Sequence, residues 1–215
     1  MDVIFSRPMI IAGCGPGSPD YLTEAVRKAV EQADVLVGAK RLLALFPESS
    51  AERIIAGVDV EIVLQAISLC HASKRIVVLV TGDPGASSLA QPVIRRFGRA
   101  ACLLIPGVSS VQAAFARIGV DWIGSRVISA HGRQPVVEPE SLQGEDRIAV
   151  LGGGRTDSLW VSHLADILGT GYAIFVCADL TLPNERVCRI TRRELAADPA
   201  SSRTIYLFVK EAFLA

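Results

Sequence analysis

The chain has 215 residues, half of them hydrophobic, and its 22 basic and 22 acidic residues give a formal net charge of zero. This length is enough for one large domain or two small ones with a substantial buried core. The even charge balance argues against a broad electrostatic surface for nucleic acid or an anionic membrane, and no apolar run is as long as a membrane span.

The N-terminal segment and the cysteines both indicate the compartment in which the protein works. The opening segment, MDVIFSRPMIIAGCG, is not typical of a secretory signal, because it lacks a basic head and its apolar part ends in a glycine loop. The five cysteines contain no C-x-x-C pair. These features predict a cytoplasmic protein with reduced thiols, most of them acting as small buried hydrophobes.

In the first half of the chain, strand patterns alternate with helix patterns. Apolar runs predict strands at 9–12, 35–37, 53–56, 76–80 and 101–105, with helices at 24–33, 42–46, 60–70 and 88–97 between them. The run 76–80 is continuously apolar, which indicates a central strand buried on both faces. The alternation predicts a doubly wound, mostly parallel five-stranded sheet.

The second half has consecutive strands without a helix between each pair. Strands are expected at 127–129, 148–151, 172–177, 186–190 and 204–209, with helices at about 156–168 and 191–196. The first of these helices has Leu159, Trp160, Leu164 and Ile167 as its expected core stripe. This pattern predicts a second, mixed-sheet α+β lobe, and we place the boundary between residues 1–122 and 123–215.

The stretch 106–133 connects these two halves. Pro106-Gly107 ends a strand, and Ser109 or Ser110 can cap the helix that follows. Residues 121–125 read as a linker, and the next strand enters His131-Gly132-Arg133. We therefore expect a cleft between two lobes to pass through this stretch.

The first strand ends in a glycine loop, Gly13-Cys14-Gly15-Pro16-Gly17. A strand–glycine loop–helix connection is a familiar phosphate site. Here the spacing is G-x-G-x-G, Pro16 removes a backbone donor, and Lys40 rather than an acidic residue follows the second strand. A tight connection without a ligand explains the glycines equally well, so both interpretations stay open at this point.

Two further loops follow the strands at 76–80 and 101–105. Doubly wound sheets bind ligands along the edge where such loops gather. In the first loop, Asp83 could accept hydrogen bonds from ribose hydroxyls. In the second, Ser109 and Ser110 at a helix start could receive a carboxylate. Three loops at equivalent positions of one sheet indicate a ligand site more strongly than any one of them.

Five segments together carry a resemblance: GCGPGSPDYLT (13–23), VGAKRLL (37–43), VTGDP (80–84), IPGVSSVQAAFARIGVDW (105–122) and ISAHGR (128–133). The chain resembles the tetrapyrrole methylase family over essentially its whole length. Within the family it is most similar to the branch of cobalamin biosynthesis that methylates carbon 5 of a corrin precursor, precorrin-6Y or cobalt-precorrin-7. The resemblance implies S-adenosylmethionine as methyl donor, two α/β lobes with the donor between them, and usually a homodimer.

The family pattern also implies which residues contact the donor. In the first lobe these are Pro16, Asp83, Ala86, Gly107, Ser109 and Ser110, and in the second lobe Leu151, Ala178 and Thr204. This chain has Gly85-Ala86-Ser87-Ser88 where the branch usually has a glycine- and aromatic-containing turn. Backbone contacts are therefore the ones expected there.

A corrin precursor carries many carboxylates, so basic side chains should bind it. We expect Lys40, Arg41, Arg133 and Arg155 to do so, whereas Arg117, on a helix, is more typical of a solvated surface charge. Methylating a ring carbon leaves a proton to be lost, which makes His131 a candidate base. Asp121 is a second candidate base, although a loop role suits it better. No metal is expected.

The expected reaction is one methylation, at carbon 5. The chain ends at Ala215 directly after the last expected strand, and only one set of cleft loops is found. We expect a separate protein to carry out the carbon-15 methylation and decarboxylation. Another tetrapyrrole methylase, a nicotinamide-dependent oxidoreductase and a non-catalytic tetrapyrrole-binding protein remain as alternatives.

Overall fold

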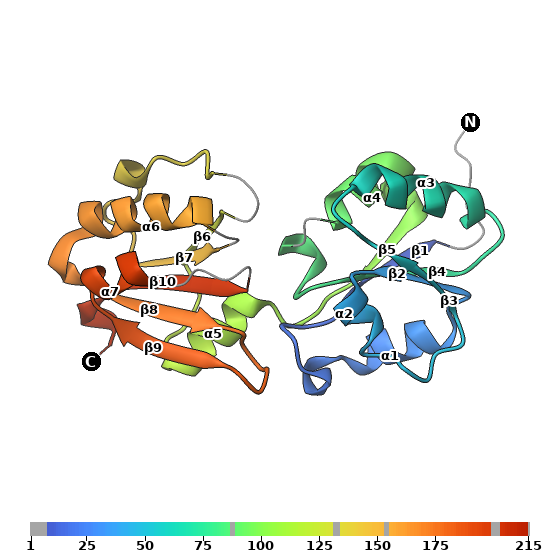
Figure 1. Cartoon of the computed structure of the whole chain (residues 1–215), viewed down its shortest axis with the longest axis horizontal. Coiled ribbons are helices and arrows are strands. Elements are labelled where there is room, and N and C mark those ends of the chain that lie inside the picture. Colours follow the sequence, from blue (N-terminus) through green and yellow to red (C-terminus); the bar gives the residue numbers. More distant parts are fainter. Residues whose placement is uncertain (1–7, 87–88, 131–133, 153–154, 199–202, 215) are drawn as a thin grey trace. The chain divides into compact units, whose positions relative to one another are not determined.

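The structure, a computed structural model, describes residues 8–86, 89–130, 134–152, 155–198 and 203–214, apart from the side chains of 155–158. It divides the chain into two compact units, Met1–Ser109 and Ser110–Ala215 (Figure 1). Each unit has its own sheet and its own core. No helix among the described residues is long and apolar enough to cross a membrane.

The first unit is built on a parallel sheet. Its strands in the described residues are β1 (Met9–Gly13), β2 (Val35–Gly38), β3 (Glu52–Ile55), β4 (Ile76–Val80) and β5 (Cys102–Ile105), in the order β3-β2-β4-β1-β5. All neighbouring strands run parallel. Every residue of β4 is buried, which confirms the prediction for this apolar run.

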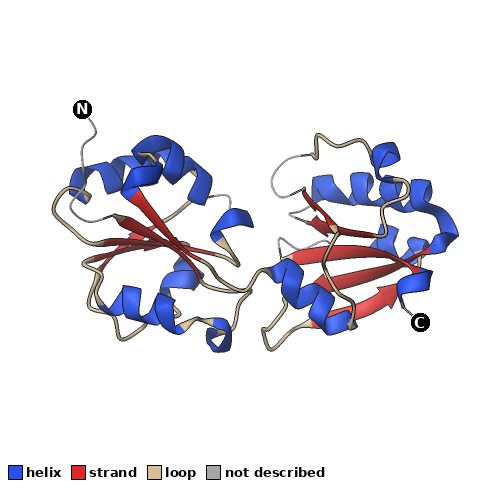
Figure 2. Cartoon of the chain, turned by 180° about the vertical axis from the view of Figure 1, so that it is seen from behind, coloured by secondary structure: helices blue, strands red, loops and turns tan. Residues whose placement is uncertain are grey.

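Helices cover both faces of this sheet (Figure 2). One face packs against α3 (Val60–Cys70) and α4 (Ala90–Phe97), and the other against α1 (Glu24–Glu31) and α2 (Lys40–Leu43). The hydroxyl of Thr23 caps α1 by accepting a hydrogen bond from the Val26 amide at 3.3 Å. The doubly wound architecture expected from the alternating pattern is confirmed.

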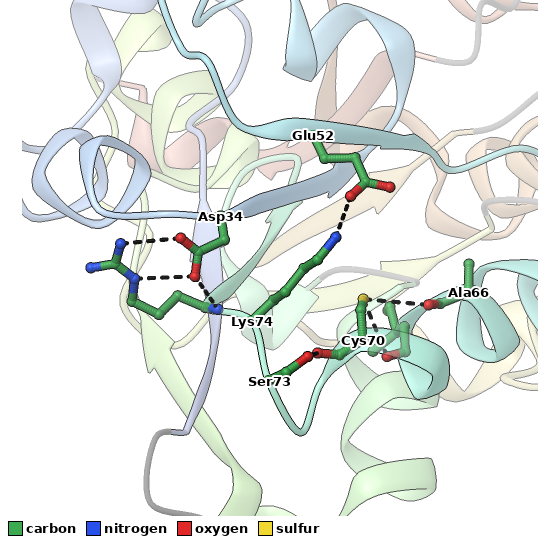
Figure 3. Close-up of polar contacts among 8 residues, drawn as sticks. Asp34, Glu52, Ala66, Cys70, Ser73 and Lys74 are labelled. Carbon is green, nitrogen blue, oxygen red and sulfur yellow. Dashed lines mark hydrogen bonds and ion pairs between the residues drawn. The ribbon is translucent and has the colours of Figure 1, made fainter.

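Charged pairs tie together the edge of this sheet at which β2, β3 and β4 begin (Figure 3). Asp34 accepts hydrogen bonds from the Arg75 backbone at 2.7 Å and from the Arg75 guanidinium at 3.1 and 3.3 Å. Lys74 binds Glu52 at 2.5 Å. These contacts join strand starts, at the edge opposite the glycine-rich loops that follow β1, β4 and β5.

The second unit has a mixed sheet. Its described strands are β6 (Arg126–Ser129), β7 (Arg147–Leu151), β8 (Tyr172–Ala178), β9 (Arg186–Ile190) and β10 (Thr204–Lys210), in the order β6-β7-β10-β8-β9. Only β6 and β7 pair in parallel among these strands, and the other pairs are antiparallel. The mixed sheet expected from the consecutive strands is confirmed. One face packs against α6 (Arg155–Leu168) and α7 (Arg192–Ala197).

The other face of the second sheet is covered by α5 (Ser110–Ile118), and here the structure differs from the expected boundary. We placed this helix in the first lobe, within residues 1–122. Its buried face, which includes Ala114 and Phe115, instead packs against Ile205 and Leu207 of β10. Small residues on α5 allow this close packing, so the unit boundary falls between Ser109 and Ser110.

The core stripe of α6 also differs in one position. Leu159 was expected to face the core, but its exposure is 79%. Trp160 and Leu164 are buried as expected, and Val161 is buried as well. The Trp160 indole donates a hydrogen bond to the Val137 carbonyl at 3.2 Å. Successive helix residues are about 100° apart, so burying Trp160 and Val161 together turns Leu159 outward.

Candidate functional site

The three loops predicted to form a ligand site lie side by side. They follow β1, β4 and β5, and these strands are adjacent in the parallel sheet in the order β4-β1-β5. Because parallel strands end at the same edge, the loops at 14–18, 81–86 and 106–109 gather there. This confirms the expected meeting of three loops at one sheet edge.

The loops contact each other through their backbones. The Cys14 amide donates to the Val80 carbonyl at 2.8 Å, and Gly15 and Gly82 exchange two hydrogen bonds of 2.8 and 3.3 Å. A Cβ atom on Gly13 would lie 2.6 Å from the Gly82 carbonyl oxygen and 2.7 Å from the Gly107 amide nitrogen. A Cβ atom on Gly107 would collide with the carbonyls of Gly13 and Gly82. The glycines therefore permit backbone-to-backbone packing of all three loops.

The Asp83 carboxylate connects two of these loops. Its Oδ1 accepts a hydrogen bond from the Gly85 amide at 2.7 Å, and its Oδ2 accepts one from the Gly107 amide at 3.2 Å. Each carboxylate oxygen can accept a further bond. Asp83 therefore shapes the loop edge through these two bonds, and its expected contact with ribose hydroxyls stays a prediction.

The other residues expected to contact the donor in this unit have different exposures. Pro16 is buried, Ala86 is exposed at the end of a short 3₁₀ helix (Pro84–Ala86), and Ser109 is half-buried. Ser110 is half-buried as well and begins α5 in the second unit. Within the first unit, a half-buried carboxylate, a serine and close-packed backbone are chemically suited to a polar zwitterion that also carries ribose hydroxyls, and the donor contacts stay a prediction.

In the second unit, three residues far apart in sequence meet at one sheet edge. Thr204 pairs with Ala178 across β10 and β8, and Ile205 pairs with Leu151 across β10 and β7. The Gly152 amide donates to the Thr204 carbonyl at 2.9 Å, and Thr204 is 2% exposed. The structure thus brings together Leu151, Ala178 and Thr204, all expected to contact the donor.

The expected substrate-binding side chains are only partly described. Lys40 and Arg41 are exposed and lie at the start of α2, directly after β2. The Arg41 guanidinium donates a hydrogen bond to the Thr81 hydroxyl, which places it beside the loop after β4. Arg133 lies outside the described residues, and Arg155 begins α6 with a side chain that is outside them as well.

Of the two candidate bases, Asp121 lies within the described residues and His131 does not. Asp121 accepts a hydrogen bond from Arg147 at 2.8 Å, and the same guanidinium donates to the Ile123 carbonyl and stacks on the Phe213 ring. Arg147 begins β7 and Leu151 ends it, about 13 Å further along at roughly 3.3 Å per residue, so Asp121 binds the strand at the end remote from Leu151. This favours a structural role for Asp121.

His131 lies outside the described residues, but the chain that leads to it is described. The Ala130 amide donates to the Leu151 carbonyl at 2.9 Å, continuing the ladder between β6 and β7. Residue 130 therefore lies at the sheet edge that also holds Leu151, Ala178 and Thr204. His131 therefore stays a prediction that is consistent with the described part of the chain.

Cys14, in the loop after β1, has a thiol that stays protonated and is therefore a poor nucleophile. Cys14 is fully buried, and burial raises the pKa of its thiol to about 12, although the Val80 backbone and Arg41 act in the opposite direction. All five cysteines are free. Only a thiolate is a good nucleophile, so Cys14 acts as a small buried hydrophobe. In the described residues, no three His, Cys, Asp or Glu side chains gather as a metal site.

Sequence reasoning missed the importance of Arg117. We expected a solvated surface charge, but its guanidinium binds Glu185 with two hydrogen bonds, Nε–Oε1 at 2.7 Å and Nη2–Oε2 at 3.2 Å. The hydrogen bonds from Arg117 lower the pKa of the Glu185 carboxyl and keep it ionised. The two residues are 68 positions apart, so no local spacing could have indicated the pair.

Fold and loop geometry together define a two-unit α/β protein with glycine-rich loops at the edge of a parallel sheet. The sequence profile of the tetrapyrrole (corrin/porphyrin) methylases matches residues 8–196. The chain therefore belongs to the tetrapyrrole methylase family and is a methyltransferase that acts on corrin precursors, as the resemblance implied. Members of this family use S-adenosylmethionine, in agreement with the expected cofactor.

Individual relatives agree with this membership. The chain is 32% identical to the cobalt-precorrin-7 C(5)-methyltransferase of Salmonella typhimurium over 83% of this chain and 88% of that protein. It is 31% identical to the decarboxylating precorrin-6Y C(5,15)-methyltransferase of Mycobacterium tuberculosis, over 89% of this chain but 48% of that protein. Its fold matches the uroporphyrin-III C-methyltransferase of Thermus thermophilus complexed with S-adenosylhomocysteine, with a TM-score of 0.76 at 20% identity and coverage of 94% and 97%.

Proposed function

We propose that this protein transfers one methyl group from S-adenosylmethionine to carbon 5 of a corrin precursor, precorrin-6Y or cobalt-precorrin-7. The observation that carries the proposal is the 32% identity, over most of both chains, to a cobalt-precorrin-7 C(5)-methyltransferase. The loops after β1, β4 and β5 support it, because their glycines, Asp83 and Ser109 fit the donor. Family membership makes the oxidoreductase and non-catalytic alternatives unnecessary.

We assign the donor contacts to the residues expected from the sequence. They are Pro16, Asp83, Ala86, Gly107, Ser109, Ser110, Leu151, Ala178 and Thr204. Asp83 would accept hydrogen bonds from ribose hydroxyls, and the serines would receive the carboxylate. Methyl transfer from a sulfonium is an in-line displacement, so the main task of these residues is alignment in a dry site. Such alignment can supply on the order of 7–11 kcal/mol of the barrier.

We propose that the carboxylates of the corrinoid substrate are bound by four basic side chains, Lys40, Arg41, Arg133 and Arg155. The Arg41 guanidinium, which donates to the Thr81 hydroxyl beside the loop after β4, carries five N–H groups in a planar arrangement that suits a carboxylate. After transfer, the methylated ring must lose or relocate a proton. We assign that step to His131, because a neutral imidazole can accept a proton near neutral pH.

We further propose a cytoplasmic homodimer that performs no carbon-15 methylation or decarboxylation, leaving that chemistry to a separate protein. The free thiols support a reducing compartment. The relative named for carbon 5 alone matches over 88% of its length, whereas the relative named for carbons 5 and 15 with decarboxylation matches over 48% of its length. Light scattering on the purified protein tests the dimer.

The reaction is tested by mass spectrometry of the product formed from purified protein, methyl-labelled donor and the authentic corrin intermediates, with and without cobalt. We expect one added methyl, located at carbon 5 by NMR, with the acetate side chain intact. Two methyls, release of carbon dioxide, or a methyl at another ring carbon would refute the proposal. A comparison of the two substrates decides whether cobalt is required.

A further inference from the structure

The loop between β8 and β9, residues 179–185, contains an unusual backbone. Asp179 has a φ of 50° and Thr181 a φ of 67°, the two non-glycine residues with positive φ in the described chain. Thr181 is the third residue of a turn closed by a 3.0 Å hydrogen bond from the Leu182 amide to the Asp179 carbonyl. Glycine is the usual residue at such a position, and a β-branched residue there is strained. Such strain persists only where surrounding contacts enforce it, and it gathers at ligand sites.

Glu185 is the first of these contacts. Its Oε2 accepts a hydrogen bond from the strained Thr181 amide at 2.5 Å. The same carboxylate binds Arg117 of α5 through two hydrogen bonds of 2.7 and 3.2 Å. Leu180, within the turn, is buried in the core cluster that α5 shares with β10. The turn is therefore fixed to α5 by a bidentate ion pair and by apolar packing.

Asp179 holds the other end of the loop. Its Oδ1 accepts from Arg203 Nε at 2.5 Å, and its Oδ2 accepts from the Asn184 amide at 2.6 Å. The Asp179 amide also donates to the Arg203 carbonyl at 3.2 Å, which extends the ladder between β8 and β10 by one step. Asp179 and Arg203 are the direct neighbours in sequence of Ala178 and Thr204. The strained loop thus begins where the proposed donor contacts of this unit lie.

We propose that Glu185 is a positioning residue for methyl transfer. Together with Arg117 it holds the Thr181 turn in its left-handed conformation, and the turn fixes the backbone of Ala178 and Thr204 against the donor. Glu185 does not touch the donor in this proposal and acts through the turn. The inference rests on the proposed function, because it assumes that Ala178 and Thr204 contact S-adenosylmethionine.

The test measures the dissociation constant of S-adenosylhomocysteine by calorimetry. We expect Glu185→Ala to weaken binding about tenfold, equivalent to about 1.4 kcal/mol, because the turn can then relax away from its strained φ. Adding Thr181→Gly to this variant should restore most of the affinity, since glycine adopts a φ of 67° without strain. Glu185→Gln, which keeps an acceptor for the Thr181 amide, should bind more tightly than Glu185→Ala.

The matched control is Glu211→Ala. It removes the carboxylate of another ion pair of the same unit, that with Arg189, just beyond the end of β10 remote from Thr204. It should leave the dissociation constant unchanged. If Glu185→Ala does not fold, Arg117→Ala removes the ion pair that holds the Glu185 carboxylate. It should weaken binding in the same direction by a smaller factor, and Thr181→Gly should again restore it.

The outcomes separate the two proposals. Wild-type binding with an equal dissociation constant for Glu185→Ala would overturn this inference alone. Weakened binding that Thr181→Gly does not restore would also overturn it, because the effect would then not pass through the turn. Absence of S-adenosylhomocysteine binding by the wild-type protein would refute the proposed function, and this inference would fall with it.

Discussion

The Oδ2 atom of Asp83 accepts a hydrogen bond from the Gly107 amide at 3.2 Å and so links the loop after β4 to the loop after β5. Oδ1 meanwhile accepts from the Gly85 amide within its own loop. The carboxylate therefore has a structural task in addition to its proposed contact with the donor. Variants at Asp83 can separate these two tasks.

Asp83→Ala should weaken binding of S-adenosylhomocysteine strongly and lower stability as well. It leaves the exposed Gly85 amide and the half-buried Gly107 amide without their acceptor, so the loss should stay below the roughly 1–3 kcal/mol of a fully buried unsatisfied donor, because water can reach them. Asp83→Asn keeps one neutral acceptor, so it should be more stable than Asp83→Ala while still losing affinity. Thermal unfolding and calorimetry measure the two effects. Equal affinity of the Asn variant and the wild type would argue against a contact that needs the charge.

Gly107→Ala should destabilise the protein rather than only obstruct the donor. The new Cβ would meet the carbonyls of Gly13 and Gly82, which are backbone atoms that cannot rotate away. Forced overpacking of this kind costs typically about 1–3 kcal/mol.

Gly57→Ala is the matched control, because nothing lies within 4 Å of the added atom. It should change stability by no more than about 0.5 kcal/mol. Urea unfolding of the three proteins measures the difference. Equal stability of Gly107→Ala and Gly57→Ala would show that the loops do not pack as described.

Cys14 should make stability fall at alkaline pH. Burial raises the pKa of its thiol to about 12 from an ordinary value near 9, so the folded state keeps its proton while the unfolded state loses it. Stability is then fully present below about pH 9 and falls between pH 9 and 12, by up to about 1.4 kcal/mol per pH unit for one thiol.

The free energy of unfolding of Cys14→Ala should fall less steeply between pH 9 and 12 than that of the wild type. The difference between the two proteins at pH 7 gives the packing energy that the substitution removes. Denaturant unfolding from pH 7 to 10.5 measures it. The variant should also retain methyl transfer, because the protonated thiol has no covalent role. Parallel pH profiles, or loss of activity in a folded variant, would contradict this view of Cys14.

Asp121→Asn and His131→Asn should affect catalysis differently. Asp121 binds Arg147 at the sheet edge opposite Leu151, so its substitution should leave the turnover number and its pH profile unchanged. His131→Asn should lower the turnover number and change its pH profile, because asparagine cannot take up the proton. Steady-state kinetics from pH 5 to 9 measure both. The reverse result would make Asp121 the base.

Local patterns in the sequence determined the strands, the loops and the family. The continuous apolar run Ile76–Val80 predicted a central strand, because both of its faces need burial, and the structure confirms it. The glycines and prolines after β1, β4 and β5 likewise predicted the loops that follow these strands, since glycine and proline interrupt strand structure. Alternation of strand and helix then placed these loops at one edge of a parallel sheet.

Tertiary structure alone decided the relationships between distant residues. The apolar face of α5 could have packed on either sheet, and its contacts with Ile205 and Leu207 placed it in the second unit. The pairing of Thr204 with Ala178 depends on strand register, and the ion pair of Arg117 with Glu185 joins residues 68 positions apart. Local propensity carries no information about such partners, because they are selected by the packing of the whole unit and not by neighbours along the chain.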